Sequence, residues 1–256
     1  MIIDVNANLE RWPFRRTPCD ELPTLLEKFR QHGIGQAWVG SLDGIFHRDI
    51  GAVNIRLADA CRSQRNPVLL PFGSINPLLP DWREDLRRCH EQFGMPGVRL
   101  HPNFHGYALK DPIFVELLDA CARRRLIVQL VIRMDDVRVQ HPLINVGEVD
   151  VAPLAPLIRD RPGLRLVILN GASKIPAKTM TALAGAGHVC FDIATQEIVG
   201  GVAALASQVT AERVLMGSHL PLFPLESAVL KVREAGLDES TRDLIESGNA
   251  LRLLAR

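Results

Sequence analysis

The stretch Arg213-Val214-Leu215-Met216-Gly217-Ser218-His219-Leu220-Pro221 has the pattern of a buried strand that ends in a sharp turn. Gly-Ser stops the apolar run, and the proline that follows favours a turn and then a new helix. His219 therefore lies where the predicted strand ends. A titratable side chain at the end of a strand is the first indication of a functional site in this chain.

The same order of strand, turn and helix recurs along the sequence. Short apolar runs predict strands, and longer segments with apolar residues three or four positions apart predict helices. The first helix is expected to use Thr17 as its cap, with Pro18 in its first turn. The predicted strands are 1–5, 36–40, 68–73, 97–100, 126–132, 165–169, 189–193 and 214–216. The predicted helices follow them at 22–29, 49–63, 82–92, 112–124, 151–159, 176–184, 200–208 and 225–235, with a closing helical segment at 239–254.

Strict alternation of strand and helix predicts a parallel sheet, because parallel neighbours need a crossover connection. Eight such units in 256 residues fit one α/β domain over residues 1–256, a closed (β/α)8 barrel. A doubly wound open sheet remains as an alternative. No Gly-x-Gly-x-x-Gly follows the first strand, which weakens the dinucleotide-binding form of that alternative.

Composition narrows the partners and the compartment. Lysine plus arginine total 30 against 29 acidic residues, so net charge gives no reason to expect a nucleic acid or an acidic membrane as partner. The five cysteines are scattered and form no Cys-x-x-Cys pair, which is typical of a reducing compartment. With no leader pattern and no apolar run long enough for a membrane span, we expect a cytoplasmic protein.

Polar residues follow most of the predicted strands. In a (β/α)8 barrel the residues that act on a substrate lie at the carboxyl ends of the strands, so these side chains are expected to share one face. They are Asn6, Asn8, Asp43, Asn76, His101, His105, Arg133, Asp135, Asn170, Asp192 and His219.

Several of these positions have a structural alternative. Asn76 is typical of a turn former, and His105 fits a loop histidine as well as a site residue. Asp192 could hold a neighbouring loop or histidine. Arg133 suits a carboxylate substrate because of its planar fork, but an ion pair with one of the aspartates just after it is an equal alternative.

Five phrases, in order along the chain, resemble the amidohydrolase-related TIM-barrel hydrolases of the amidohydrolase 2 type. They are Ile3-Asp4-Val5-Asn6-Ala7-Asn8, Gly97-Val98-Arg99-Leu100-His101-Pro102, Leu166-Val167-Ile168-Leu169-Asn170-Gly171, Gly217-Ser218-His219-Leu220-Pro221 and Gly248-Asn249-Ala250-Leu251-Arg252-Leu253-Leu254. The resemblance implies a (β/α)8 barrel in which a divalent metal, usually zinc, activates water for hydrolysis. In some branches it supports non-oxidative decarboxylation instead. The resemblance also implies a small-molecule substrate and leaves association into homo-oligomers open.

The family's usual metal ligands are His-x-His after strand one, a histidine after strand five or six, and an aspartate after strand eight. The matching positions here are Asn6 and Asn8, Val131 or Asn170, and His219; only His101, in the strand-four phrase, is kept. Neutral amide oxygens are poor zinc ligands. The sequence therefore predicts a divergent member with no metal ligand set and no cofactor, with one alternative in which His101, His219 and amide oxygens still hold a zinc ion.

Besides the ordinary family activity with a metal bound by unexpected ligands, two functions remain open at this stage. In the first, the protein is a metal-independent hydrolase, or a lyase such as a decarboxylase, for a small anionic carbonyl compound, with His219 and His101 as acid-base groups. Its expected substrate contacts are Asn6, Asn8, Asn170, Arg133 and His105, the asparagines as donors to developing negative charge. In the second, the barrel is catalytically inactive and binds a small ligand or a protein partner.

Overall fold

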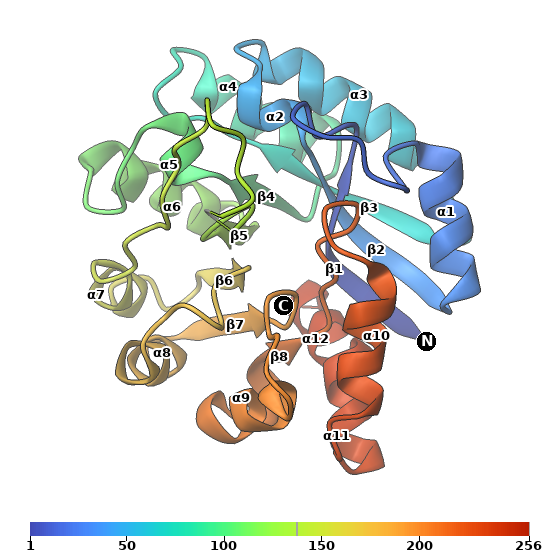
Figure 1. The fold of residues 1–256 in the computed structure, drawn as a ribbon. Coiled ribbons are helices and arrows are strands. Elements are labelled where there is room, and N and C mark those ends of the chain that lie inside the picture. The colour runs from blue at the N-terminus through green and yellow to red at the C-terminus, as the bar shows by residue number, and fades with distance from the viewer. Residues whose placement is uncertain (137, 256) are drawn as a thin grey trace.

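The computed structural model describes residues 1–136 and 138–255 of the chain. Within them, eight parallel strands pair in sequential order in one sheet, so the predicted (β/α)8 barrel is confirmed (Figure 1). The strands are β1 (Ile2–Leu9), β2 (Ile34–Ser41), β3 (Val68–Ser74), β4 (Gly97–Leu100), β5 (Ile127–Val131), β6 (Arg165–Leu169), β7 (His188–Asp192) and β8 (Val214–Leu215).

The sheet curls until its first strand meets the segment that follows β8. Val5 N donates to Met216 O at 3.0 Å, Asn8 N donates to Leu220 O at 2.8 Å, and His219 N donates to the backbone oxygen of Asn6 at 2.6 Å. These bonds continue the parallel ladder past the short last strand. The turn around His219 thus completes the barrel where β1 ends.

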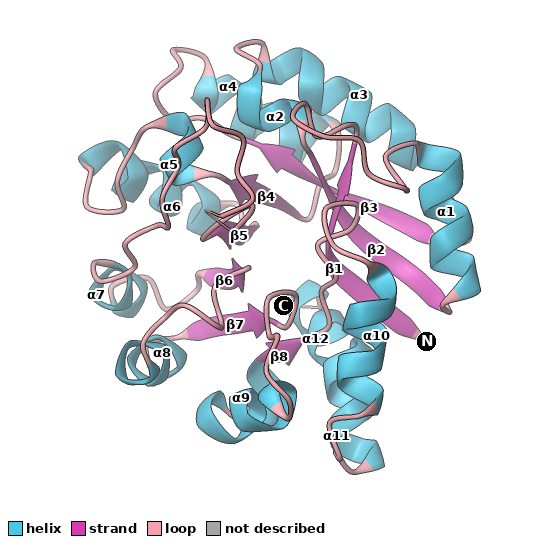
Figure 2. Cartoon of the chain, viewed as in Figure 1, coloured by secondary structure: helices cyan, strands magenta, loops and turns pink. Residues whose placement is uncertain are grey.

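Most of the helices surround the ring of strands (Figure 2). They are α1 (Leu22–Gln31), α2 (Asp43–Phe46), α3 (Ile50–Arg62), α4 (Trp82–Arg87), α5 (Pro102–His105), α6 (Pro112–Arg123), α7 (Leu154–Arg159), α8 (Ala177–Ala184), α9 (Gly201–Val209), α10 (Leu225–Arg233), α11 (Glu239–Asp243) and α12 (Asn249–Leu254). The short α2 and α5 were not predicted; both follow a strand directly and lie at the mouth of the barrel.

The predicted start of the first helix is wrong. α1 begins at Leu22 after Glu21, and its first turn holds Pro23 rather than Pro18. The segment before it forms a separate turn, which Arg16 closes by donating from Nε to Asp20 Oδ2 at 2.6 Å. A proline does lie in the first turn of this helix, but it is the second of the two prolines in this stretch of the chain.

Apolar side chains fill the lower part of the barrel. Trp38 and Phe72 stack inside it with ring centroids 5.0 Å apart, and Leu253 from α12 packs into the same cluster from the amino-terminal end. Because this apolar cluster fills the amino-terminal part of the barrel, polar side chains inside the barrel lie toward the carboxyl ends of the strands.

No helix among the described residues is long and apolar enough to cross a membrane. All five cysteines are buried, and none of them forms a disulfide bond. The cytoplasmic location remains a prediction.

Candidate active site at the barrel mouth

Six polar side chains converge at the carboxyl ends of the strands, and each is at most 2% exposed. They come from β1, from β7, from the residues directly after β4 and β6, and from the turn that follows β8. The members are Asn6, Asn8, His101, Asn170, Asp192 and His219. The structure therefore brings together His101 and His219, the three asparagines predicted as substrate contacts, and Asp192, which was expected at the same face.

Asn6, Asn170 and Asp192 form a closed hydrogen-bond network. Asn6 Nδ2 donates to Asp192 Oδ2 at 2.6 Å and to Asn170 Oδ1 at 2.8 Å. Asp192 Oδ1 accepts the backbone N–H of Asn170 at 2.8 Å. Burial raises the pKa of Asp192 to about 6, although these donors lower it. Both amide hydrogens of Asn6 are thus engaged inside the protein.

His219 connects this network to the loop that follows β5. Its Nε2 lies 2.8 Å from Met134 O, so Nε2 carries the hydrogen, and Nδ1 accepts from Asn170 Nδ2 at 3.3 Å. Asn170 Nδ2 also donates to Arg133 O at 2.9 Å. The backbones of Asn170 and His219 are left-handed, with φ of 58° and 62°, a conformation that Asn and His adopt more readily than most residues.

Asp4 fixes the turn that carries His219, and the sequence analysis missed it. Its Oδ1 accepts the backbone N–H groups of Asn6 and Ser218, both at 3.0 Å, and its Oδ2 accepts the Ser218 hydroxyl at 2.5 Å. Burial raises the pKa of Asp4. A carboxyl group inside the apolar run Ile2-Ile3-Asp4-Val5 was the available signal.

Arg99, from the middle of β4, was also missed. Its Nη1 donates to Asn8 Oδ1 and to Ala7 O, both at 2.7 Å, and its Nε donates to Gln129 Oε1 at 2.8 Å. A Cβ at Gly40 would lie 2.7 Å from Arg99 Cδ, so glycine leaves the room that this side chain fills. Desolvation lowers the pKa of Arg99 to about 9, which still leaves it charged at neutral pH.

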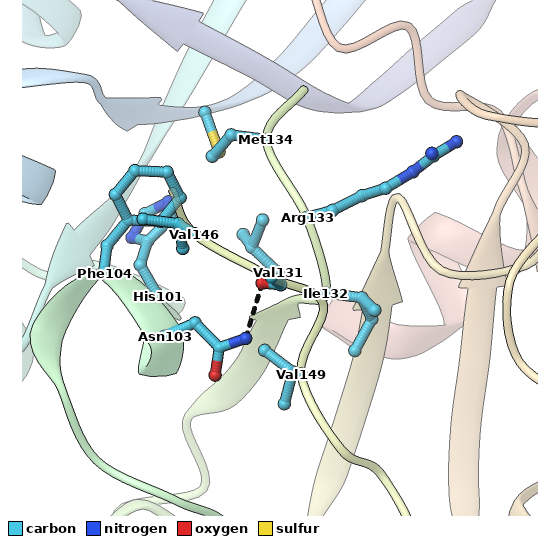
Figure 3. A pocket seen from close by; sticks show the side chains of 10 residues that line it. His101, Asn103, Phe104, Val131, Ile132, Arg133, Met134, Val146 and Val149 are labelled. Atoms are coloured by element: carbon cyan, nitrogen blue, oxygen red, sulfur yellow. Dashed lines mark hydrogen bonds between the residues drawn. The ribbon is translucent and has the colours of Figure 1, made fainter. Parts of the chain in front are cut away.

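His101 differs from the other site residues because neither of its ring nitrogens has a hydrogen-bond partner. It lines a cavity of about 10 Å³, roughly the space that one water molecule needs. Most of the other cavity walls are apolar (Figure 3), formed by Phe104, Val131, Ile132, Met134, Val146 and Val149. Burial lowers the pKa of His101 well below its usual value, so the ring is neutral at pH 7.

The remaining predicted residues lie at the edge of this group. The Arg133 side chain points away from His101 in Figure 3; its Nη2 lies 3.4 Å from Ser173 Oγ. Of its two expected partners, Asp135 pairs with Arg15 instead, and Asp136 approaches Arg133 only to 3.9 Å. His105 Nε2 lies 3.0 Å from Gly44 O, and its ring centroid is 6.0 Å from that of His101.

The side chains at the family's metal-ligand positions do not fit a divalent cation as they are arranged. Asn8 Oδ1 accepts from the Arg99 cation, and Asn6 turns its amide nitrogen into the network. His219 Nε2 is protonated. Among the described residues, no group of three or more His, Cys, Asp or Glu side chains could hold a metal ion. Among the described residues at these positions, His101 has two ring nitrogens without partners, and the nearby His105 has one, its Nδ1.

A model of the Amidohydrolase family, of the amidohydrolase 2 type, matches residues 31–256. This chain belongs to that amidohydrolase family. The match covers all the strands after β1 and confirms the family expected from the five phrases. No curated protein sequence matches the chain.

Solved structures of similar fold include three decarboxylases. A 2,6-dihydroxybenzoate decarboxylase from Rhizobium is 16% identical, with 98% of this chain and 99% of that chain covered and a TM-score of 0.74. A 5-carboxyvanillate decarboxylase from Sphingomonas paucimobilis is 15% identical, with 99% and 98% covered and a TM-score of 0.75. A dihydroxybenzoic acid decarboxylase from Polaromonas, with bound manganese and the inhibitor 2-nitroresorcinol, is 12% identical, with 99% and 96% covered and a TM-score of 0.75. At these identities the likeness shows the amidohydrolase fold.

Acidification is expected to destabilise the amidohydrolase barrel through His219. Burial lowers its pKa to about 4 in the folded protein, against about 6.5 in an unfolded chain. Between these values the unfolded state binds a proton that the folded state does not, so the free energy of unfolding rises with pH. The full contribution is on the order of 3 kcal/mol. The free energy of unfolding, measured with urea between pH 4 and 6.5, should therefore rise less steeply with pH for His219→Asn than for the wild type.

Asp192 acts in the opposite direction across this range, because burial raises its pKa to about 6. The slope of the free energy of unfolding against pH is therefore compared between the variants and the wild type. His47→Asn, which changes a histidine whose side chain is 52% exposed, serves as the matched control. Equal slopes for all three proteins would contradict the neutral, buried state of His219.

Proposed function

We propose that this amidohydrolase-family protein is a lyase that decarboxylates a small aromatic carboxylic acid, with His101 as its acid-base group and without a divalent metal. The observation that carries this proposal is the unpartnered, buried imidazole of His101 beside an apolar cavity. A buried polar group without a partner costs free energy, so its presence in a family of enzymes indicates a functional role.

An apolar site favours loss of carbon dioxide over hydrolysis. Hydrolysis needs a water molecule held and activated by polar groups, whereas decarboxylation disperses the negative charge of the substrate as the carboxylate leaves. Around Phe104, the rings of Trp12 and Phe46 lie with centroids 6.3 and 5.9 Å away. These aromatic side chains favour an aromatic substrate, which agrees with the decarboxylases of similar fold.

The neutral His101 is suited to proton uptake when the substrate binds. A carboxylate placed beside the ring favours the imidazolium, which raises the low pKa that burial imposes. In the reaction the bond between the substrate carbon and the carboxylate breaks, and carbon dioxide leaves. The electron pair of that bond takes a proton from the His101 imidazolium, and the ring is neutral again. The proton taken up from solvent on binding balances the one given to carbon.

With the loop after β5 lying as it does in this structure, the other predicted site residues have positioning roles in this proposal. Asn6 and Asn170 already donate their amide hydrogens within the protein, and both ring nitrogens of His219 have partners. Asn8 is the exception, because its Nδ2 is buried without an acceptor and is free to donate to a substrate oxygen. The same contacts support the proposed metal independence, since Asn8 accepts from Arg99 and Asn6 donates to Asn170 and Asp192.

The proposal is tested by measuring carbon dioxide release from a panel of benzoic acids with ortho-hydroxyl or methoxy groups, followed by product analysis. We expect at least one acid of this class to be decarboxylated by the wild type.

The occupied amide donors favour a second candidate, an inactive barrel that binds such an acid. Binding of panel members without turnover of any of them would contradict the proposed lyase and support that candidate. Association of copies of the chain remains a prediction.

A further inference from the structure

The residues directly after β5 form a strap across the barrel mouth, which we define as Arg133–Asp136. The chain leaves the sheet at Ile132, whose N–H donates to Leu169 O at 3.0 Å, and Val149 N donates to Ile132 O at 3.0 Å. The chain therefore leaves the sheet after Ile132 and meets it again at Val149, which bonds to the same Ile132. Such a connection can move without altering the strands on either side.

Two candidate site residues donate hydrogen bonds to the strap from inside the barrel. Asn170 Nδ2 donates to Arg133 O at 2.9 Å, and His219 Nε2 donates to Met134 O at 2.8 Å. Both donors are fully buried side chains at strand ends. The acceptors are consecutive backbone oxygens of a loop, so the best-placed donors of the site are occupied by the protein itself.

A salt bridge holds the strap from outside. Arg15, in the loop after β1, donates from Nη1 to Asp135 Oδ2 at 2.9 Å and from Nη2 to Asp135 Oδ1 at 3.1 Å. The side chain of Asp135 is only 3% exposed, whereas that of Arg15 is 37% exposed. The two loops also meet where the rings of Phe14 and His141 lie 5.6 Å apart. A planar two-bond pair of this kind orients both partners.

The closed strap leaves no room for a substrate. The cavity beside His101 has about 10 Å³, and Met134 of the strap forms part of its wall. A benzoic acid needs many times the space of one water molecule. An acid can therefore reach His101 only when part of the cavity wall is displaced, and Arg133 and Met134 of the strap belong to that wall.

We propose that the strap is an autoinhibitory contact in which the backbone oxygens of Arg133 and Met134 take the places of substrate oxygens, and that Arg15 and Asp135 hold it closed. When the strap moves, Asn170 Nδ2 and His219 Nε2 donate to oxygen atoms of a carboxylic acid instead. Asn170 Nδ2 and His219 Nε2 each have an acceptor in both states, so neither state leaves these two donors unsatisfied. The substrate class rests on the proposed function; the strap itself does not.

In this proposal the Arg15–Asp135 salt bridge sets the fraction of protein molecules that are open and can bind an acid. The apparent dissociation constant equals the intrinsic constant divided by the fraction of open protein. Loss of the Arg15–Asp135 pair raises that fraction, so the variant should bind an acid more tightly than the wild type, by about tenfold.

The experiment compares Arg15→Ala with Arg16→Ala, which removes the neighbouring arginine and its ion pair with Asp20 but no contact to the strap. Sodium benzoate is titrated into each protein by calorimetry, and amide hydrogen exchange is followed at Arg133–Asp136. We expect about tenfold tighter benzoate binding and faster strap exchange in Arg15→Ala, with wild-type values in Arg16→Ala. Asp135→Asn should behave like Arg15→Ala and serves if that variant folds poorly.

Unchanged exchange at the strap in Arg15→Ala would overturn the proposal, as would benzoate binding that is unchanged, weaker or absent. Weaker binding would mean that Arg15 holds the acid rather than the strap. Tighter binding without decarboxylation of any acid would contradict the proposed lyase and leave the strap supported, so the two proposals fail separately.

Discussion

Replacing Arg99 by methionine should lower the free energy of unfolding by about 3–5 kcal/mol, the largest effect on stability that we expect from one substitution. Methionine keeps most of the volume but leaves the oxygens of Ala7, Asn8 and Gln129 without their donor. It also removes the positive charge that favours the ionised forms of the buried carboxyl groups in the network. Urea unfolding at pH 7 measures the change.

The matched control is Arg62→Met on α3, where the side chain is 71% exposed and its ion pair with Asp59 is at the surface. Such pairs contribute little, so a change below about 0.5 kcal/mol is expected. If Arg99→Met also lowered the free energy of unfolding by less than about 1 kcal/mol, the hydrogen bonds of Arg99 would not stabilise the barrel as we expect.

Replacing His101 by leucine should lower the decarboxylation rate by about 10²–10⁴-fold, the range for loss of a positioned acid-base group. The same change should leave the free energy of unfolding unchanged or higher, because it removes two buried nitrogens that have no partners. The measurements are carbon dioxide release with a panel acid and urea unfolding of the same preparation. His47→Leu, at a half-exposed position, controls for loss of a histidine. Full turnover in His101→Leu would remove His101 from the mechanism.

The free energy of unfolding is expected to fall in Arg99→Met and to stay unchanged or rise in His101→Leu. This difference distinguishes the role of Arg99 from that of His101. Arg99 is held by the structure and stabilises it, whereas His101 is left unsatisfied by the structure and does not. Residues kept in spite of a cost to stability are typical of functional sites.

The fold was predictable because its signal is local. Alternation of apolar runs and amphipathic segments gave the eight strands in order, since parallel strands require the crossovers that the helices provide. The residues directly after those runs, such as His101 and Asn170, had to meet at one face once the barrel closed. The turn around His219 was predictable for the same reason.

The inward polar residues were harder to predict, although a signal was present. Side chains alternate between the two faces of a strand, so Arg99 must share the interior with His101, two positions later. Asp4 interrupts an apolar run in the same manner. Neither residue was predicted to belong to the site, because both lie within strands and not at their ends.

The hydrogen-bond partners could not be predicted from the sequence. Asn6 and Asn170 are 164 positions apart, and only the closed barrel determines which amide atoms face each other. The pairing of Arg15 with Asp135 spans 120 positions and displaces the expected pairing with Arg133. Local patterns carry no information about such contacts, which is why the asparagines were expected to be free donors.

The most direct test of the account is the decarboxylation assay repeated on protein stripped of divalent metals by a chelator, with metal content measured by mass spectrometry. We predict less than stoichiometric zinc and manganese in the untreated protein, and the same turnover before and after stripping. One zinc or manganese ion per chain, with turnover that is lost on its removal and restored by its return, would contradict the metal-independent site.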